Sequence, residues 1–515
     1  MTLARCWRVC LGLLGLLSCA PFAAAEVKLP AIFADHMVLQ RGVPVPVWGW
    51  ADADEAVTVT LGDQSQKATA DASGKWCVKL PQREAGGPLQ LTIKGRNTIE
   101  IKDALVGEVW LCSGQSNMAM TVGGVKNAAE EKAAAKYPQI RMFTVARTPA
   151  ETPQDKCGGD WKVCSPDTVS GFSAAGYFFG LELHLRLEVP VGLINSSWGG
   201  TPVQAWTSLE AQRALPALQP MLEGWKRQIA DYNPEAAQKR FEKQLAEWKA
   251  KAAAAKEADK QAPRRPQSPI DPRMSPHRPA NLYNGMIAPL APYALRGAIW
   301  YQGESNAGGT GAALYGLQLA TMIKNWRQLW GQGDFPFEWV QLPNFRAPQK
   351  APVETSGWVI VQEQMLKTLA VPNTGMAITI DVGEADDIHP RNKQDVGKRL
   401  ALWALGTTYG KDIAYSGPLY KSMSKQDGKI KLTFDHVGGG LVAQGGKLKG
   451  FAIAGENREF VFADAQIVGD AVVVSSPQCT APVAVRYAWA QNPECNLFNK
   501  AGLPASPFRT DEWDK

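Results

Sequence analysis

The order of apolar and polar positions divides this chain into segments of different texture. From residue 26 to about residue 103, short runs alternate apolar and polar side chains, and turns such as Asp71–Gly74 separate them. Alternation with a period of two gives a strand one buried face, so this spacing predicts a small antiparallel sandwich. Residues 411–515 return to the same texture. The strands expected there are Lys429–Phe434, Phe451–Ala454 and Ala471–Ser475.

Between these regions, apolar runs alternate with longer helical patterns. This order is typical of a parallel sheet covered by helices, so we expect a three-layer α/β/α domain flanked by the two β modules. The expected strands are Glu108–Cys112, Ile140–Val145, Val191–Asn195, Gly297–Tyr301, Phe337–Leu342 and Met376–Asp381. The expected helices are Ala174–Arg186, Tyr315–Trp330 and Lys393–Leu405. Ligands of such sheets bind where the carboxyl ends of the strands meet the following loops.

A helical, charged and then Pro-rich stretch interrupts this pattern from about residue 208 to residue 280. Its apolar residues recur at helical spacing, at Phe241, Leu245, Trp248 and Ala252. We interpret the stretch as a solvated helical hairpin inserted in a loop, rather than as a coiled coil that binds a partner. The predicted division of the chain is residues 1–25, 26–103, 104–207, 208–280, 281–410 and 411–515, with the α/β domain in 104–207 and 281–410.

The first 25 residues have the composition of an export signal. Arg5 and Arg8 precede a short apolar run, Leu11–Leu17, and Ala23–Ala25 supplies the small residues that a signal peptidase requires. We expect cleavage after Ala25 and a periplasmic or extracellular protein; the alternative is lipidation of Cys19 and an outer-membrane lipoprotein. The apolar run is too short to span a bilayer, and no later segment is apolar for long enough.

Charge and cysteine content narrow the classes of partner and cofactor. The net charge is +6, and two of these charges lie in the expected signal, which argues against nucleic acid or an anionic membrane as partner. The cysteines beyond residue 25 include two pairs close in sequence, Cys157 with Cys164 and Cys479 with Cys495, which export would allow to form disulfides. No C-x-x-C pair or His/Cys cluster is present, so we expect no zinc site.

A serine follows the first expected strand of the α/β domain. The segment Trp110–Met118 is an apolar run that leads into Gly114-Gln-Ser-Asn117, which places Ser116 at the carboxyl edge of the sheet. The N–H groups of a helix that begins there would bind an anion. The second glycine of the α/β-hydrolase elbow G-x-S-x-G is missing. Ser116 is therefore a candidate nucleophile, and a capping serine in a tight turn is the alternative.

A base for this serine is found among five histidines. Only His389 follows an expected strand of the parallel sheet, in a loop rich in carboxylates. Asp386 precedes it by three residues, a spacing that lets a carboxylate fix the imidazole tautomer while the other ring nitrogen faces Ser116. A solvated turn or a calcium site is the alternative for such a loop.

Blocks spread along the chain carry a family resemblance. Gly114–Asn117, Ser197–Thr201, Trp300–Asn306 and Asp386–His389 occur in the order seen in SGNH-type carbohydrate esterases. The chain resembles the sialate O-acetylesterase-like branch of that superfamily and is similar, in its insert and β modules, to bacterial xyloglucan acetylesterases. The resemblance extends from Leu29 to the end of the chain and implies an SGNH-hydrolase-like fold.

The resemblance also implies roles for individual residues. It makes Ser116 the nucleophile, Asp386 the acid and His389 the base. The oxyanion donors would be the N–H groups of Ser116 and Gly200 and the side-chain amide of Gln302. Many members have Gly-x-Asn-Asp where this chain has Gln302-Gly-Glu-Ser, so the side-chain donor is open, and Glu304 is a rival for the acid. The tryptophans beside these blocks would stack on a sugar ring, with core packing as the alternative for each, and a structural carboxylate that holds the Gln302 loop is the alternative for Glu304. The residues expected to support the site or bind substrate are thus Asn117, Glu304, Trp198, Trp206 and Trp300.

The residues and the resemblance together predict a serine esterase that removes acetyl groups from an oligosaccharide or polysaccharide through an acetyl-serine intermediate. This reaction implies no metal and no organic cofactor. Acetylated sialic acid, xylan and xyloglucan are the candidate substrates. The alternative is a carbohydrate-binding protein that keeps the fold without catalysis. Because the insert starts and ends beside the catalytic blocks, we expect it and the β modules to wall the cleft; a hairpin that points away from the site is the alternative.

Overall fold

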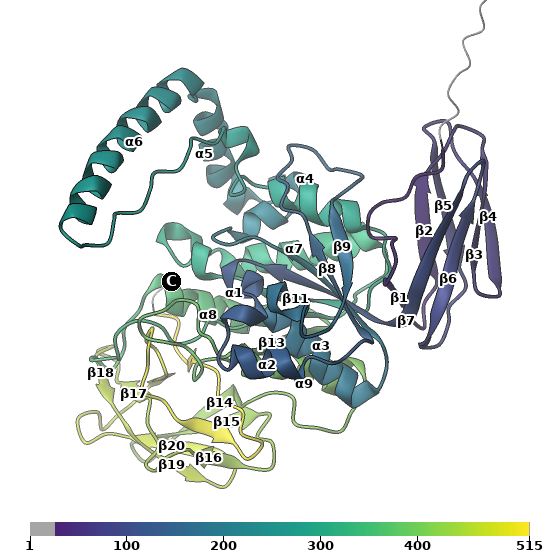
Figure 1. Cartoon of the computed structure of the whole chain (residues 1–515). Helices are drawn as coiled ribbons and strands as arrows, with labels where there is room; N and C mark the ends of the chain where they lie inside the picture. Colours follow the sequence, from purple (N-terminus) through teal and green to yellow (C-terminus); the bar gives the residue numbers. More distant parts are fainter. Residues whose placement is uncertain (1–25, 514–515) are drawn as a thin grey trace, which may run out of the picture.

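The computed structural model describes residues 26–513 as an N-terminal β module, a central α/β domain and a C-terminal β module (Figure 1). The expected signal and Cys19 lie outside the described residues. No helix among residues 26–513 has the length and apolar character needed to cross a membrane.

The central domain is built on a sheet with strand order β13–β12–β11–β7–β10–β8–β9. All neighbouring strands along this order pair in parallel, except that β9 runs antiparallel to β8. The strands are β7 (Thr98–Gly114), β8 (Ile140–Val145), β9 (Gly159–Val163), β10 (Val191–Ser197), β11 (Gly297–Tyr301), β12 (Phe337–Val340) and β13 (Thr374–Ala377). The six strands that the sequence predicts all form, but β7 begins at Thr98 rather than Glu108, and β13 ends at Ala377 rather than Asp381.

Helices cover both faces of this sheet, as the apolar pattern predicts. Successive residues of β11 point to opposite faces of the sheet and enter different cores. Trp300 packs with α7, whereas Tyr301 lies in the cluster that contains residues of α3 and α9. One layer therefore contains α3 (Ala174–Leu187) and α9 (Lys393–Trp403), and the other contains α7 (Tyr315–Trp330) and α8 (Gly357–Thr368). Shorter helices are α1 (Ser116–Ala119), α2 (Ala128–Ala134) and α4 (Leu209–Arg213).

The N-terminal module is joined to the sheet by one continuous strand. The first part of β7 pairs with β6 and β1, and its last residues pair with β10 and β11, so the strand passes through the expected boundary at residue 103 without a linker. Glu108 on β7 is fully buried. Its carboxylate accepts a hydrogen bond from the Nε of Arg41 in the module (2.5 Å) and one from the Nε of Arg296 in the central domain (2.8 Å). The module strands are β1 (Val38–Gln40), β2 (Val45–Trp50), β3 (Ala56–Leu61), β4 (Gln64–Thr69), β5 (Lys75–Leu80) and β6 (Gly86–Lys94).

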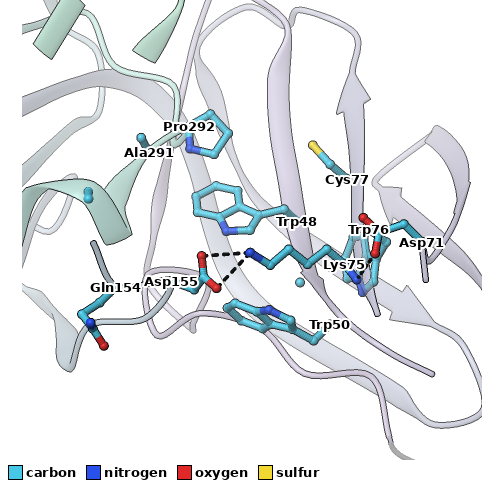
Figure 2. Close-up of a pocket in the computed structure, with 12 residues that line it drawn as sticks. Trp48, Trp50, Asp71, Lys75, Trp76, Cys77, Gln154, Asp155, Ala291 and Pro292 are labelled. Carbon is cyan, nitrogen blue, oxygen red and sulfur yellow. Dashed lines mark hydrogen bonds and ion pairs between the residues drawn. The ribbon is translucent and has the colours of Figure 1, made fainter. Parts of the chain in front are cut away.

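A pocket of about 350 Å³ lies where this module meets the central domain. Trp48 and Trp50 project from the same face of β2, with the Lys75 side chain between them (Figure 2). The Lys75 ammonium is 2.9 Å from the carboxylate of Asp155 in the central domain. The Trp48 ring lies 6.5 Å from that of Tyr293, also in the central domain. Aromatic contacts and an ion pair therefore fasten the module to the domain.

The insert forms a helical hairpin, α5 (Gln219–Ala230) and α6 (Pro234–Glu257), that buries no side chain. Its long helix α6 projects away from the sheet and the helices that cover it (Figure 1). This agrees with a solvated hairpin. The expected part of the insert in walling the substrate cleft stays a prediction.

The C-terminal module consists of antiparallel sheets with orders β14–β15–β20–β19, β18–β17–β21–β23 and β16–β22. Glu363 of α8 accepts from Arg509 of β23 at 2.8 Å, and both side chains are buried, which ties the module to the central domain. The strands are β14 (Leu419–Gln426), β15 (Lys429–Asp435), β16 (Leu441–Ala443), β17 (Phe451–Ala454), β18 (Phe460–Phe462), β19 (Asp464–Val468), β20 (Ala471–Ser475), β21 (Ala484–Tyr487), β22 (Leu497–Asn499) and β23 (Phe508–Arg509).

The expected disulfides are absent from the described residues. Cys157, Cys164, Cys479 and Cys495 are free thiols, so the predicted pairings are wrong in this structure. Proximity in sequence does not bring the Cβ atoms to bridging distance, because the path of the backbone decides that geometry.

Candidate active site

The end of strand β7 positions Ser116. Gly114 has φ +138°, and a Cβ atom at this residue would lie 2.1 Å from the carbonyl oxygen of Tyr301. Only glycine permits this close approach to β11. The chain then turns, and α1 begins at Ser116, which is half-buried at the carboxyl edge of the sheet. The local sequence thus presents the hydroxyl at the position expected for a ligand site.

His389 meets this serine from the loop that follows β13. The Ser116 Oγ lies 2.9 Å from the His389 Nε2, a distance at which the hydroxyl donates to the imidazole. The two residues are 273 positions apart in the chain. The structure therefore brings together the candidate nucleophile and the candidate base that the sequence pairs.

The carboxylate nearest to the second ring nitrogen belongs to Asp387. Its Oδ1 lies 3.5 Å from the His389 Nδ1 and also accepts the His389 backbone N–H at 2.8 Å. Asp386, predicted for this role, is exposed, and no ion pair joins it to His389 among the ion pairs of residues 26–513. The Asp386 prediction is wrong in this geometry, because the turn held by the Asp387 carboxylate directs that side chain, and not its neighbour, toward the imidazole.

Glu304, the rival for the acid, is half-buried, and its carboxylate lies beside Asn117. Its Oε1 accepts from Asn117 Nδ2 at 2.5 Å, and its Oε2 is buried with no hydrogen-bond partner in the described structure. Burial raises the pKa of Glu304, while the Asn117 hydrogen bond and the positive charge of Lys393 act in the opposite direction. Asn117 also donates to the carbonyl oxygen of Ile388 at 3.0 Å, so it connects Glu304 to the His389 loop.

Lys393 is a site residue that the sequence analysis missed. Its side chain is fully buried, and its Nζ donates to Asn117 Oδ1 (2.7 Å) and to the carbonyl oxygen of Pro390 (2.5 Å). Burial lowers its pKa to about 7. A signal was present: α9 begins at Lys393, where the helix dipole disfavours a cation.

Gln302 is committed to hydrogen bonds within the protein. Its Nε2 lies 3.1 Å from Gln115 Oε1, 3.2 Å from the Thr201 carbonyl oxygen and 2.8 Å from Asn306 Oδ1, and the residue is fully buried. Three acceptors share its two amide protons, which leaves no free donor for an oxyanion. The geometry contradicts the predicted oxyanion role; Gln302 instead joins the segments that carry Gln115, Thr201 and Asn306.

The glycine loop after β10 lies against the serine. A Cβ atom at Gly199 would lie 3.3 Å from the Ser116 Cβ. Gly200, which is exposed and has φ +76°, has its carbonyl oxygen 3.1 Å from the Nε2 of His277, a residue of the segment that returns from the insert. The N–H groups of Ser116 and Gly200 stay the predicted oxyanion donors.

Two of the three predicted sugar-stacking tryptophans are core residues. Trp206 and Trp300 are fully buried, and their rings pack edge-to-face with centroids 6.0 Å apart. They cannot contact a sugar, so these two predictions are wrong. Trp198 is half-buried beside the glycine loop and remains a candidate.

The arrangement as a whole suits acyl transfer. A hydroxyl within hydrogen-bond distance of an imidazole, with a carboxylate at the other ring nitrogen, is the minimum for an activated serine. Within residues 26–513, no group of three or more His, Cys, Asp or Glu side chains is placed to hold a metal ion.

Comparisons with known proteins point to the same chemistry. A family model described as carbohydrate esterase, sialic acid-specific acetylesterase, matches residues 106–231 and 272–405, and the gap in the match contains α6. The sialate O-acetylesterase of Rattus norvegicus is 31% identical and that of Homo sapiens 30%, each over 94% of this chain and over 94% and 93% of their own lengths. A solved carbohydrate acetylesterase from Xanthomonas citri has a TM-score of 0.80 and 39% identity, over 95% of this chain and 100% of that one.

Proposed function

The chain belongs to the family of sialic acid-specific carbohydrate acetylesterases, and from that premise we propose that it hydrolyses O-acetyl esters of glycans with Ser116 as nucleophile. The observation that carries this proposal is the 2.9 Å contact between Ser116 Oγ and His389 Nε2 at the carboxyl edge of the sheet. A protein that only binds carbohydrate needs neither a hydroxyl activated by an imidazole nor a carboxylate beside that imidazole.

The reaction follows from these contacts. His389 accepts the hydroxyl proton as Ser116 Oγ attacks the acetyl carbonyl carbon, and the N–H groups of Ser116 and Gly200 stabilise the oxyanion. The imidazolium then gives its proton to the departing sugar oxygen, which leaves an acetyl-serine. Water then attacks the carbonyl carbon of this ester as His389 accepts its proton; the bond between that carbon and Ser116 Oγ breaks, the imidazolium returns the proton to Oγ, and acetate leaves. Asp387 fixes the orientation of the imidazole and stabilises its positive charge.

The substrate that we propose is an acetylated oligosaccharide or polysaccharide met outside the cytoplasm. The relatives named above act on sialate esters or carbohydrate esters, so acetylated sialic acid, xylan and xyloglucan are the classes to test. The acetyl group is too small to distinguish these sugars, because one small contact changes discrimination by only about 1–3 kcal/mol. Selectivity must therefore come from surfaces around the Ser116 edge, with Trp198 among them.

Acetate release from a panel of acetylated sialic acid, xylan and xyloglucan tests the proposal, with a small activated acetyl ester in parallel. Ser116→Ala should fold normally and lose activity by about four orders of magnitude or more. The matched control is Ser113→Ala, which changes a buried serine near the end of β7, the strand that leads into Ser116. Near-normal turnover by folded Ser116→Ala, or binding of these glycans without any acetate release by the unaltered protein, would contradict the proposal.

A further inference from the structure

The buried lysine at the start of α9 lies beneath the His389 loop. None of the Lys393 side chain is exposed. Its two oxygen acceptors are Asn117 Oδ1 and the Pro390 carbonyl oxygen, and its Nζ lies 5.3 Å from the centroid of the Tyr301 ring, on whose face a cation is attracted. Two oxygens and an aromatic ring account for the three protons of an ammonium group.

Both hydrogen-bond acceptors of Lys393 belong to residues next in sequence to Ser116 or His389. Asn117 follows Ser116 in the chain, and Pro390 follows His389. The Asn117 amide completes the connection, because its Nδ2 donates to Glu304 Oε1 and to the Ile388 carbonyl oxygen. The backbone on both sides of His389 is thereby held by one network, Lys393–Asn117–Glu304.

A lysine at this position destabilises the folded state in two ways. A buried ammonium loses its hydration, and the amino end of a helix repels it. An apolar residue would fill the same volume without either cost. The Glu304 carboxylate, whose Oε2 atom is buried, carries a charge opposite to that of Lys393 across Asn117, so each desolvation cost is offset only when both residues are present.

We propose that Lys393 is a positioning residue for catalysis: with Asn117 and Glu304 it clamps the Ile388–Pro390 backbone so that His389 Nε2 stays within hydrogen-bond distance of Ser116. This rests on the proposed function. It assigns Glu304 to a buried counter-charge rather than to the acid of the triad. A small displacement of the imidazole is enough to matter, since about 1 Å of misplacement costs about 10²-fold in rate.

Four variants test the proposal: Lys393→Met, Glu304→Gln, the double variant, and Lys398→Met as a control on an exposed lysine of the same helix. Turnover of a small acetyl ester should fall about 10²-fold in Lys393→Met, with KM changed less than about threefold, because the clamp acts on the imidazole and not on the substrate. The rate at which a sulfonyl fluoride modifies Ser116 should fall in parallel. Lys398→Met should behave as the unaltered protein.

The double variant separates positioning from charge balance. Without either charge it should regain the thermal stability that Lys393→Met loses, yet stay about as slow, because the Pro390 carbonyl and Asn117 still lack their donor. Recovery of turnover in the double variant would overturn the proposal, as would turnover of folded Lys393→Met within twofold of normal. If Lys393→Met fails to fold, the double variant alone decides. Failure of the proposed function is distinguishable, because then the unaltered protein itself releases no acetate.

Discussion

The carboxylate at His389 can be assigned by exchanging Asp387 for asparagine. The asparagine side chain would still accept the His389 backbone N–H through its amide oxygen, so the turn that Asp387 Oδ1 holds at 2.8 Å should persist. What is lost is a negative charge 3.5 Å from the Nδ1 of the imidazole that becomes protonated during the reaction.

The size of the effect follows from distance and exposure. Two unit charges at this separation interact by about 1–5 kcal/mol for effective dielectric constants between those of water and a protein surface. The His389 and Asp387 side chains are 42% and 45% exposed, which places the interaction at the lower end, near 1–2 kcal/mol. Asp387→Asn should therefore reduce kcat/KM about 5- to 30-fold, far less than the ~10⁴-fold seen where the triad carboxylate is buried.

The assay compares acetate release by Asp387→Asn and the matched variant Asp386→Asn at several ionic strengths. Salt screens exposed charges, so the difference between the unaltered protein and Asp387→Asn should shrink as salt is raised. Asp386→Asn should stay within about threefold of normal, since that side chain is exposed and outside the imidazole's reach. A larger loss from Asp386→Asn than from Asp387→Asn would refute the assignment.

Two further predictions concern the loops and the insert. Gln302→Ala should lower the free energy of unfolding by about 1–3 kcal/mol, measured in denaturant, because it strands the buried partners Gln115 and Asn306; unchanged stability with lost turnover on every ester would instead support the oxyanion role. Replacing residues 232–262 with a short flexible linker should leave both thermal stability and turnover of a small acetyl ester unchanged, because α6 buries no side chain. Any selective loss on a glycan in that variant would show that the insert contacts the substrate, and loss on the small ester would contradict its separation from the reactive pair.

The periodicity of apolar residues predicts the strands and helices of the central domain well, because the buried faces of these elements impose that periodicity. The ranges Gly297–Tyr301 and Tyr315–Trp330 form with the ends read from the sequence, since a strand buried on both faces and a helix with one apolar side leave distinct patterns. The pairing of Ser116 with His389 was also accessible, because both follow strands whose carboxyl ends must meet at one edge.

The sequence could not predict which way individual side chains point, above all within irregular loops. Asp386 and Asp387 are neighbours of the same type, and only the turn decides which one faces the imidazole. Trp300 is a core residue because α7 covers that face of β11, a fact that motif matching does not register. The sequence does not predict that Lys393 is buried, because a lysine on a helix is ordinarily solvated. Its place at the first position of α9, where the helix dipole disfavours a cation, was the available signal.

The continuous strand β7 has a consequence for how the molecule comes apart. Its residues form hydrogen bonds with β1 and β6 at one end and with β10 and β11 at the other, and Ser116 lies two residues beyond its last position. The N-terminal module and the catalytic sheet consequently share one cooperative unit of unfolding, in which local opening of the module frays the strand that presents the nucleophile. A truncation after residue 103 would not release an independent domain; it would cut through β7 and leave residues 104–107 without the partners that β1 and β6 supply.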